Sequence, residues 1–292
     1  METVLKGRKS VVTITPDRPT VLVGRCASRA MCRRPVGEAV VSYVEIARNE
    51  ALAQVAAGAD VVNVNGGAMG PDQAEFLPRA VERIQESVEV PISVETANPE
   101  ALAAALEACR GKPLINGVDG GEQSLSQILP LAARYGAVVI GRCRDEEGVP
   151  DDPYGRLEIA RKITERAEPL GIPREDVLID CLTQAVETNP EAALITLETV
   201  RLVRAELEAN MTLDINAVSN ELPNSGSLHQ ALLTAAIAEG VNVPIIDVAR
   251  DRQAILALDV ILGRDESAKR YIRYYHYRRS GMRGLVDWEM MG

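Results

Sequence analysis

The feature that most constrains this chain is a regular alternation of short apolar segments with longer segments of helical periodicity. Eight apolar segments of strand length lie at residues 19–24, 60–67, 90–96, 113–117, 136–141, 176–181, 210–219 and 241–249. Segments with apolar residues at helical spacing follow them, at about 40–57, 71–88, 99–109, 121–134, 153–169, 190–208, 226–239 and 251–262. The strands are apolar on both faces, as expected when both faces of a parallel sheet are covered.

Strict alternation of strands and helices predicts an α/β fold, and eight units predict a (β/α)8 TIM barrel. The 292 residues suffice for such a barrel, which takes roughly 250. An open doubly wound sheet is the alternative, disfavoured because no GxGxxG motif follows the first strand. We expect an N-terminal extension at 1–18 over the barrel's edge, the barrel at 19–265 and a Tyr- and Arg-rich tail at 266–292.

Charge and cysteine content limit the class of protein. The net charge is 32 − 42 = −10, which argues against a general nucleic-acid-binding protein. The sequence has no apolar span of membrane-helix length, and its N-terminus lacks the apolar region of a secretory signal. Five scattered cysteines in a chain of this size are expected to be reduced thiols, which fits a cytoplasmic protein.

Amides and carboxylates stand at the ends of the expected strands, where TIM-barrel enzymes carry their chemistry. These residues are Asn63, Asn65, Glu95, Asn98, Asn116, Asp180, Asp214, Asn216, Ser219, Asn220 and Asp247. Asn63 and Asn65 are two residues apart, so both side chains should point to the same side of their strand. The alternative for that segment is a turn that uses Asn and Gly for backbone geometry alone.

Several common kinds of site are not expected. The strand ends carry no nucleophile–base pair, and neither His229 nor His276 follows an expected strand. Cys26 and Cys32 lack the close Cys-x2-Cys spacing typical of zinc sites, so we expect no metal. Amides and carboxylates instead suit a flat heterocycle that carries several N–H and C=O groups. Asp180 can accept two hydrogen bonds from such a ring, and its alternative role is an ordinary helix cap.

Basic residues cluster in the loops after three of the strands. Arginines follow the first, fifth and eighth strands, at Arg25, Arg29, Arg33, Arg34, Arg142, Arg144, Arg250 and Arg252. A TIM barrel would place all eight on one face of this acidic protein. The local positive potential there would attract an anionic ligand or partner.

The chain resembles the pterin-binding methyltransferases in its strand-end segments, which are AGADVVNVNGG, VPISVETANPEAL, PLINGV, PLAARYGAVVIG and VLIDCL. The resemblance spans about residues 19–265 and is to the methyltetrahydrofolate:corrinoid methyltransferases, relatives of dihydropteroate synthase and of the folate domain of cobalamin-dependent methionine synthase. It implies a homodimeric TIM barrel of one-carbon metabolism that binds tetrahydrofolate in its mouth. It also implies transfer of the N5 methyl group to the cobalt of a corrinoid (cobalamin) protein. Because no DxHxxG segment occurs here, we expect the corrinoid on a separate chain.

The resemblance also implies roles for individual residues. In the family an asparagine after strand three approaches N5, and Asn98 occupies that position as the implied catalytic residue. A carboxylate after strand six holds the amino-pyrimidinone edge of the pterin, and Asp180 matches it. The implied substrate-binding residues are Asn63, Asn65, Glu95, Asn116, Asp180, Asn216, Ser219 and Asp247.

Several positions depart from the family's pattern. Asn63 and Glu95 stand where aspartates are usual, and Ala217 stands where the loop after strand seven has an asparagine. The segment 24–28 replaces the usual Gly-Glu-Arg-x-Asn. Two other hypotheses stay open: a family barrel acting on another methylated anionic small molecule, and a binding subunit that has lost catalysis. Dihydropteroate synthase is disfavoured, since no lysine ends strand seven and no Ser-Arg follows strand eight.

Overall fold

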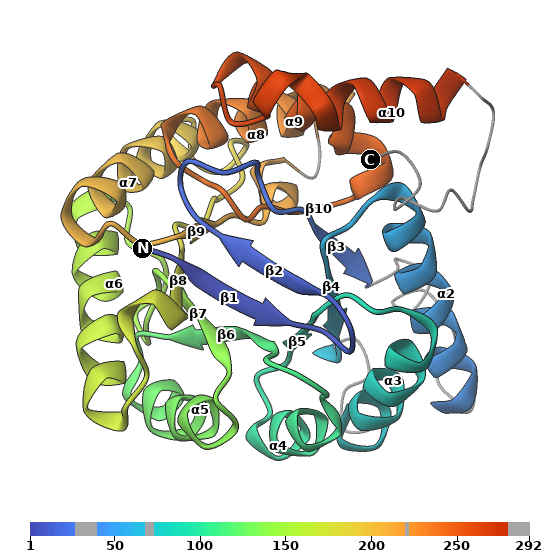
Figure 1. Ribbon diagram of the computed structural model, residues 1–292. Helices are drawn as coiled ribbons and strands as arrows, with labels where there is room; N and C mark the ends of the chain where they lie inside the picture. Colours follow the sequence, from blue (N-terminus) through green and yellow to red (C-terminus); the bar gives the residue numbers. More distant parts are fainter. Residues whose placement is uncertain (27–39, 68–72, 220–221, 280–292) are drawn as a thin grey trace.

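The protein is described by a computed structural model for residues 1–26, 40–67, 73–219 and 222–279. The parallel strands are β3 (Val23–Cys26), β4 (Val61–Asn65), β5 (Ile92–Glu95), β6 (Leu114–Asp119), β7 (Val138–Arg142), β8 (Val177–Asp180), β9 (Met211–Thr212) and β10 (Ile245–Ile246). They form one eight-stranded sheet in the order β10-β3-β4-β5-β6-β7-β8-β9 (Figure 1). Asp214, just after β9, pairs with Ile245 of β10 and closes the ring, which confirms the predicted (β/α)8 barrel.

Helices surround the ring of strands, one between each strand and the next (Figure 1). They are α2 (Val40–Ala57), α3 (Gln73–Ser87), α4 (Pro99–Ala108), α5 (Glu122–Tyr135), α6 (Pro153–Ala167), α7 (Ala192–Leu207), α8 (Ser225–Glu239) and α9 (Val248–Ile261). All eight predicted helices are present, and most boundaries lie within two residues of the prediction.

The last two strands differ most from the prediction. The segment 210–219 forms only the two-residue strand β9, because a 3-10 turn at Ile215–Val218 follows it. Likewise β10 is only two residues long, because Asp247 caps α9 by accepting a hydrogen bond from the amide of Ala249. Helix α9 therefore begins three residues earlier than predicted.

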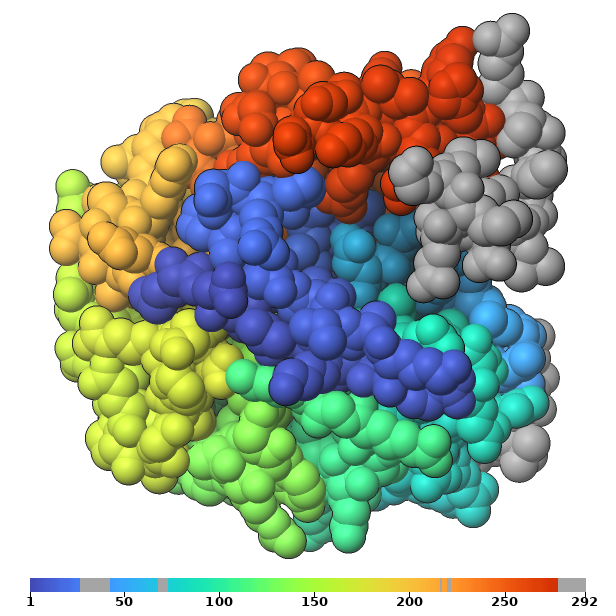
Figure 2. All heavy atoms as spheres, in the orientation of Figure 1, coloured from blue at the N-terminus to red at the C-terminus, as the bar shows by residue number. Residues whose placement is uncertain are grey.

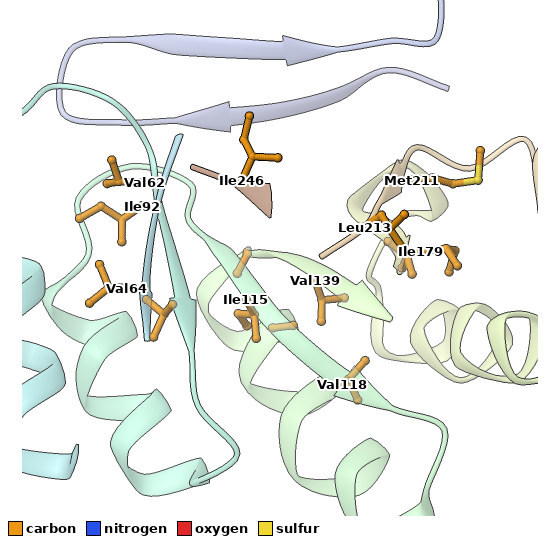
Figure 3. Packing of buried hydrophobic residues seen from close by; sticks show 14 of the residues in the cluster. Val62, Val64, Ile92, Ile115, Val118, Val139, Ile179, Met211, Leu213 and Ile246 are labelled. Atoms are coloured by element: carbon orange, nitrogen blue, oxygen red, sulfur yellow. The ribbon is translucent and has the colours of Figure 1, made fainter. Parts of the chain in front are cut away.

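The main core lies between the sheet and the helices. Alternate strand residues such as Val62 and Val64 point outward and pack against Phe76, Leu77 and other helical side chains. Figure 3 shows part of this packing around the ring of strands. Burial of both faces of each strand explains the nearly continuous apolar runs in the sequence.

A second apolar cluster fills the floor of the barrel. It combines inward residues of the strands, such as Val61, Leu114 and Leu178, with Leu5 and Ile14 from the N-terminal segment. Those two residues belong to an antiparallel hairpin of β1 (Thr3–Lys6) and β2 (Val11–Ile14). The hairpin lies across one end of the barrel (Figures 1 and 2). The predicted polar extension thus contributes two core residues.

Hydrogen bonds place the hairpin at the N-terminal ends of the strands. Asn210, which precedes β9, donates to the Thr3 hydroxyl at 2.8 Å and accepts from Asn242 at 2.7 Å. Lys6 exchanges backbone hydrogen bonds with Lys112, which precedes β6. This end of the barrel is closed, so the carboxyl ends of the strands form its mouth.

Beyond the barrel, helix α10 (Lys269–Arg279) packs against α9. Its Arg270 donates to the backbone oxygen of Thr20 at 3.2 Å, on the closed side of the barrel. The division of the chain after residues 18 and 265 stays a prediction. Within the described ranges, no helix is both long and apolar enough to cross a membrane.

Candidate active site at the barrel mouth

Inward-facing residues change from apolar to polar along several strands toward the mouth. In β4, Val61 belongs to the floor and Asn63 follows it two residues later. In β8, Leu178 is followed in the same way by Asp180. Because all eight strands run parallel, their polar ends meet at the same end of the barrel.

Asn63, Glu95 and Asn116 form one hydrogen-bonded group. The side-chain nitrogen of Asn63 donates to Glu95 Oε2 at 2.6 Å, and its oxygen accepts from Ser93 at 2.8 Å. Asn116 donates to the Asn63 oxygen at 3.3 Å and to Glu95 Oε2 at 3.4 Å. Asn63 is 0% exposed and so lies beneath Glu95, which is partly exposed. The structure therefore brings three of the predicted site residues together, with Asn63 in a supporting position.

Arg142, at the end of β7, fixes the orientation of the Asn116 amide in this group. Its Nη2 donates to the Asn116 side-chain oxygen at 3.1 Å. Arg142 also lies 3.9 Å from the carboxylate of Asp119, which is 3.5 Å from Arg144. A fixed donor on its oxygen sets which way the Asn116 amide faces. The sequence alone places Arg142 only among the loop cations.

Asp180 is the buried acid of the mouth. It is 4% exposed, pairs in register with Arg142 of β7, and accepts a hydrogen bond from the Leu182 amide at 2.9 Å. Burial raises the pKa of Asp180 to about 7, while the Leu182 amide and Arg142 act in the opposite direction. Near neutral pH this carboxyl group can therefore either accept or donate a hydrogen bond.

Three predicted site residues have local backbone roles. Asn98 caps α4, where its side-chain oxygen accepts from the amides of Glu100 and Ala101 at 2.9 and 3.1 Å. Asn65 accepts from the amide of Gly67. Asp247 is exposed and caps α9. None of the hydrogen bonds within the described residues joins these three to the Asn63 group.

Ser219 is buried in a contact between two loops. Its hydroxyl donates to Glu187 Oε1 at 2.6 Å, and its backbone oxygen lies 3.2 Å from His229 Nε2. The loop after β9 is thereby joined to the loop after β8. The predicted contribution of the Asn216 side chain lies outside what the structure describes.

The arginines do not all gather at the mouth, so that prediction was wrong. Arg252 is buried, and its Nη1 donates to the backbone oxygen of Ala57 at 2.7 Å, at the end of α2 that leads into β4. The early start of α9 turns Arg252 toward this end of α2. Arg29, Arg33 and Arg34 lie outside the described residues.

Arg25 pairs with Asp214, an ion pair that sequence reasoning missed. Their strands, β3 and β9, are separated by β10. Because β10 is only two residues long, Arg25 and Asp214 meet at the mouth beyond its end. In the sequence the two residues belong to separate sets, one of loop cations and one of strand-end acids.

Two comparisons with known proteins bear on this site. A model of the family described as pterin binding enzyme matches residues 37–247. The methylcorrinoid:tetrahydrofolate methyltransferase of Eubacterium limosum is 26% identical over 242 residues, which cover 80% of this chain and 88% of that protein. The methionine synthase of Mycobacterium tuberculosis is 26% identical over 228 residues, 71% of this chain but 19% of the synthase.

Solved structures share the architecture. Dihydropteroate synthase of Yersinia pestis superposes with a TM-score of 0.68 at 17% identity, over 90% of this chain and 100% of that chain. The Xanthomonas albilineans enzyme gives 0.67 at 21% identity, over 89% of this chain and 98% of that chain. At these identities the likeness establishes the fold alone.

Proposed function

Because the chain belongs to the pterin binding enzyme family, we propose that it transfers a methyl group between N5 of tetrahydrofolate and the cobalt of a corrinoid protein. The Eubacterium limosum relative, whose name states this pair of reactants, supports the proposal over most of both chains. The observation that carries it is the polar edge inside the mouth, formed by the buried Asn116 and Asp180 and the partly exposed Arg142.

This edge suits the amino-pyrimidinone side of a pterin. The ring presents an amino group and a ring N–H side by side, and Asp180 accepts hydrogen bonds from both when it is ionised. The Asn116–Glu95 group and the Arg142 guanidinium supply further acceptors and donors around the same ring. A ligand of this kind would compensate the cost of burying Asp180 away from water.

Chemistry at N5 requires a donor on the leaving nitrogen. When the bond between N5 and the methyl carbon breaks, the electron pair stays on N5, which is a poor leaving group unless it is protonated or hydrogen-bonded. We assign this donor role to the side-chain amide of Asn98. The side-chain oxygen of Asn98 is occupied in capping α4, so its side-chain nitrogen is the atom that would donate a hydrogen bond to N5.

The partner in this proposal is a corrinoid protein, as the name of the Eubacterium limosum relative suggests. The cobalt serves as the methyl acceptor or donor and is held by that partner. By family resemblance we propose a homodimer. The four cysteines within the described residues are free thiols, which supports a reducing compartment such as the cytoplasm.

An anaerobic turnover assay tests the proposal. The protein is mixed with methyltetrahydrofolate and cob(I)alamin, and formation of methylcobalamin is followed by visible absorption. We expect turnover in the wild type and its loss in Asp180→Ala, with Arg161→Met as a control on the outer surface of α6. Folded wild-type protein that transfers no methyl group in either direction, with free corrinoid or with corrinoid proteins, would contradict the proposal.

A second candidate is methyl transfer from another methylated, anionic small molecule. It is favoured by Arg25, whose buried Nε has no hydrogen-bond partner among the described residues while its Nη2 pairs with Asp214. A carboxylate ligand would compete with Asp214 for this guanidinium. Binding of methylated carboxylates that is lost in Arg25→Met, together with no binding of tetrahydrofolate, would favour this alternative.

A further inference from the structure

Arg156 of α6 is a completely buried cation. Its guanidinium bonds neutral acceptors: the backbone oxygens of Pro150 (2.8 Å), Cys181 (3.2 Å) and Leu182 (2.9 Å), and the Gln184 side chain (3.0 Å). Within the described ranges, no carboxylate lies at ion-pair distance from it. Burial accordingly lowers the pKa of Arg156. Burying a charge without an opposite charge is costly, so a residue of this kind calls for an explanation.

One acceptor of Arg156, Leu182, is in an unusual backbone conformation. This residue has a φ of 49°, in the left-handed region that residues with a Cβ avoid. Its carbonyl accepts from Arg156 and from the Thr196 hydroxyl, both at 2.9 Å. Two donors thus hold Leu182 in this conformation.

The held conformation has a consequence at the mouth. With Leu182 left-handed, its amide turns back and donates to Asp180 Oδ1 at 2.9 Å. One residue therefore connects the buried cation, on the helix side of β8, with the buried acid on the inner side. Arg156 itself is 0% exposed and cannot contact a ligand in the mouth.

We propose that Arg156 is a positioning residue: it holds Leu182 left-handed and thereby orients the Asp180 carboxyl group for hydrogen bonding to the pterin edge. This inference rests on the proposed function for its ligand, but the orientation of Asp180 is measurable without one. A merely structural arginine would tie the loop together and leave Asp180 unaffected.

The first experiment needs no ligand. The pKa of Asp180 is measured by carbon-13 NMR in the wild type, Arg156→Met and the double variant Arg156→Met with Leu182→Gly. Loss of the Leu182 hydrogen bond should raise the pKa of Asp180 above the wild-type value in Arg156→Met. Glycine adopts the left-handed conformation freely, so the double variant should return toward the wild-type value. If Arg156→Met changed the pKa of Asp180 only by removing a distant positive charge, adding Leu182→Gly would not restore the wild-type pKa.

The second experiment is a binding cycle with tetrahydrofolate. Arg156→Met should raise the Kd about tenfold, and adding Leu182→Gly should recover most of that loss. In an Asp180→Ala background, Arg156→Met should change the Kd by less than about twofold, because the group it orients is gone. Arg161→Met, in the same helix but at the surface, is the matched control and should change neither the pKa nor the Kd.

The outcomes separate the two proposals. An unchanged Asp180 pKa in folded Arg156→Met overturns the positioning role, as does a Kd loss of equal size with and without Asp180. Wild-type protein that binds no tetrahydrofolate overturns the proposed function, and the NMR result then decides the positioning role alone. If Arg156→Met does not fold, Arg156→Lys takes its place, since a lysine keeps the charge but cannot reach all four acceptors.

Discussion

Arg142 donates a hydrogen bond from Nη2 to the side-chain oxygen of Asn116, at 3.1 Å, between neighbouring strands at the barrel mouth. This contact turns the Asn116 amide nitrogen toward Asn63 and Glu95. A single cation therefore fixes the donor and acceptor pattern of the group. We expect the ligand specificity of the mouth to depend on this pattern of donors and acceptors.

Replacing Arg142 should weaken the site without unfolding the barrel. In Arg142→Met the Asn116 amide loses its fixed orientation, and tetrahydrofolate affinity should fall by about 1–2 kcal/mol. The pKa of Asp180 should also rise above about 7, because Arg142 is one of the groups that lower it. Calorimetry across pH 6 to about 9 measures both effects. Unchanged affinity and pH dependence would exclude Arg142 from the site.

Restoring the family's aspartate at position 63 should destabilise this protein. Asn63→Asp places a buried carboxylate against Glu95, 2.6 Å from the present amide nitrogen. We expect the free energy of unfolding at pH 7 to fall by about 2 kcal/mol or more, and to recover at lower pH as protonation relieves the repulsion. Denaturant titrations at several pH values test this. Asn189→Asp, at a turn where the side chain accepts from the Glu191 amide, is the matched control. Equal stability of the two variants would contradict the observed network.

Two substitutions of Asn98 separate its cap from its proposed catalytic role. Asn98→Ala removes the cap of α4 and should cost about 1 kcal/mol of stability. Asn98→Asp keeps the capping oxygen but lacks the amide N–H, so stability should stay within a few tenths of a kcal/mol while turnover falls about a hundredfold. Thermal unfolding and the methyl-transfer assay give the two quantities. Full turnover in Asn98→Asp would remove Asn98 from the mechanism.

The raised pKa of Asp180 makes the stability depend on pH. Its folded value of about 7 lies above the value of 3.8 expected for an unfolded chain, so the neutral form is favoured in the fold. Its contribution is complete below pH 3.8 and is lost as pH rises to about 7, by up to about 4 kcal/mol. The variant Asp180→Asn should not show this loss. Parallel pH profiles of the unfolding free energy for both proteins test the sign and the range.

The fold was readable from the sequence because its signals are local. Short apolar strands and helices with apolar residues at helical spacing alternate eight times, and a Gly-Ala or Gly-Val pair precedes three of the strands. The hairpin was missed because its packing rests on few residues, chiefly Leu5 and Ile14, and because four-residue strands give little periodicity. Arg252 was expected at the barrel mouth. Because α9 begins three residues earlier than predicted, the Arg252 side chain instead reaches the backbone oxygen of Ala57 at the end of α2.

The site was predictable by residue type but not by contact. Asn63, Glu95, Asn116 and Asp180 stand at strand ends, and register brings the first three together. The orientation of the Asn116 amide within this group depends on Arg142, which the sequence places only among the loop cations. Ser93 offered one usable signal, a polar residue at an inward position of an apolar strand. The left-handed Leu182 has none, because nothing in a leucine favours that conformation.

Anaerobic calorimetry with methyltetrahydrofolate, on the wild type and on Asp180→Ala, tests most directly whether this mouth holds a pterin. We expect micromolar binding by the wild type and a loss of about 1–3 kcal/mol in the variant, since the buried donors of the ligand are left unpaired. Circular dichroism should show both proteins equally folded. Equal affinity in the two proteins, or no binding by folded wild type, would contradict a pterin site at the barrel mouth.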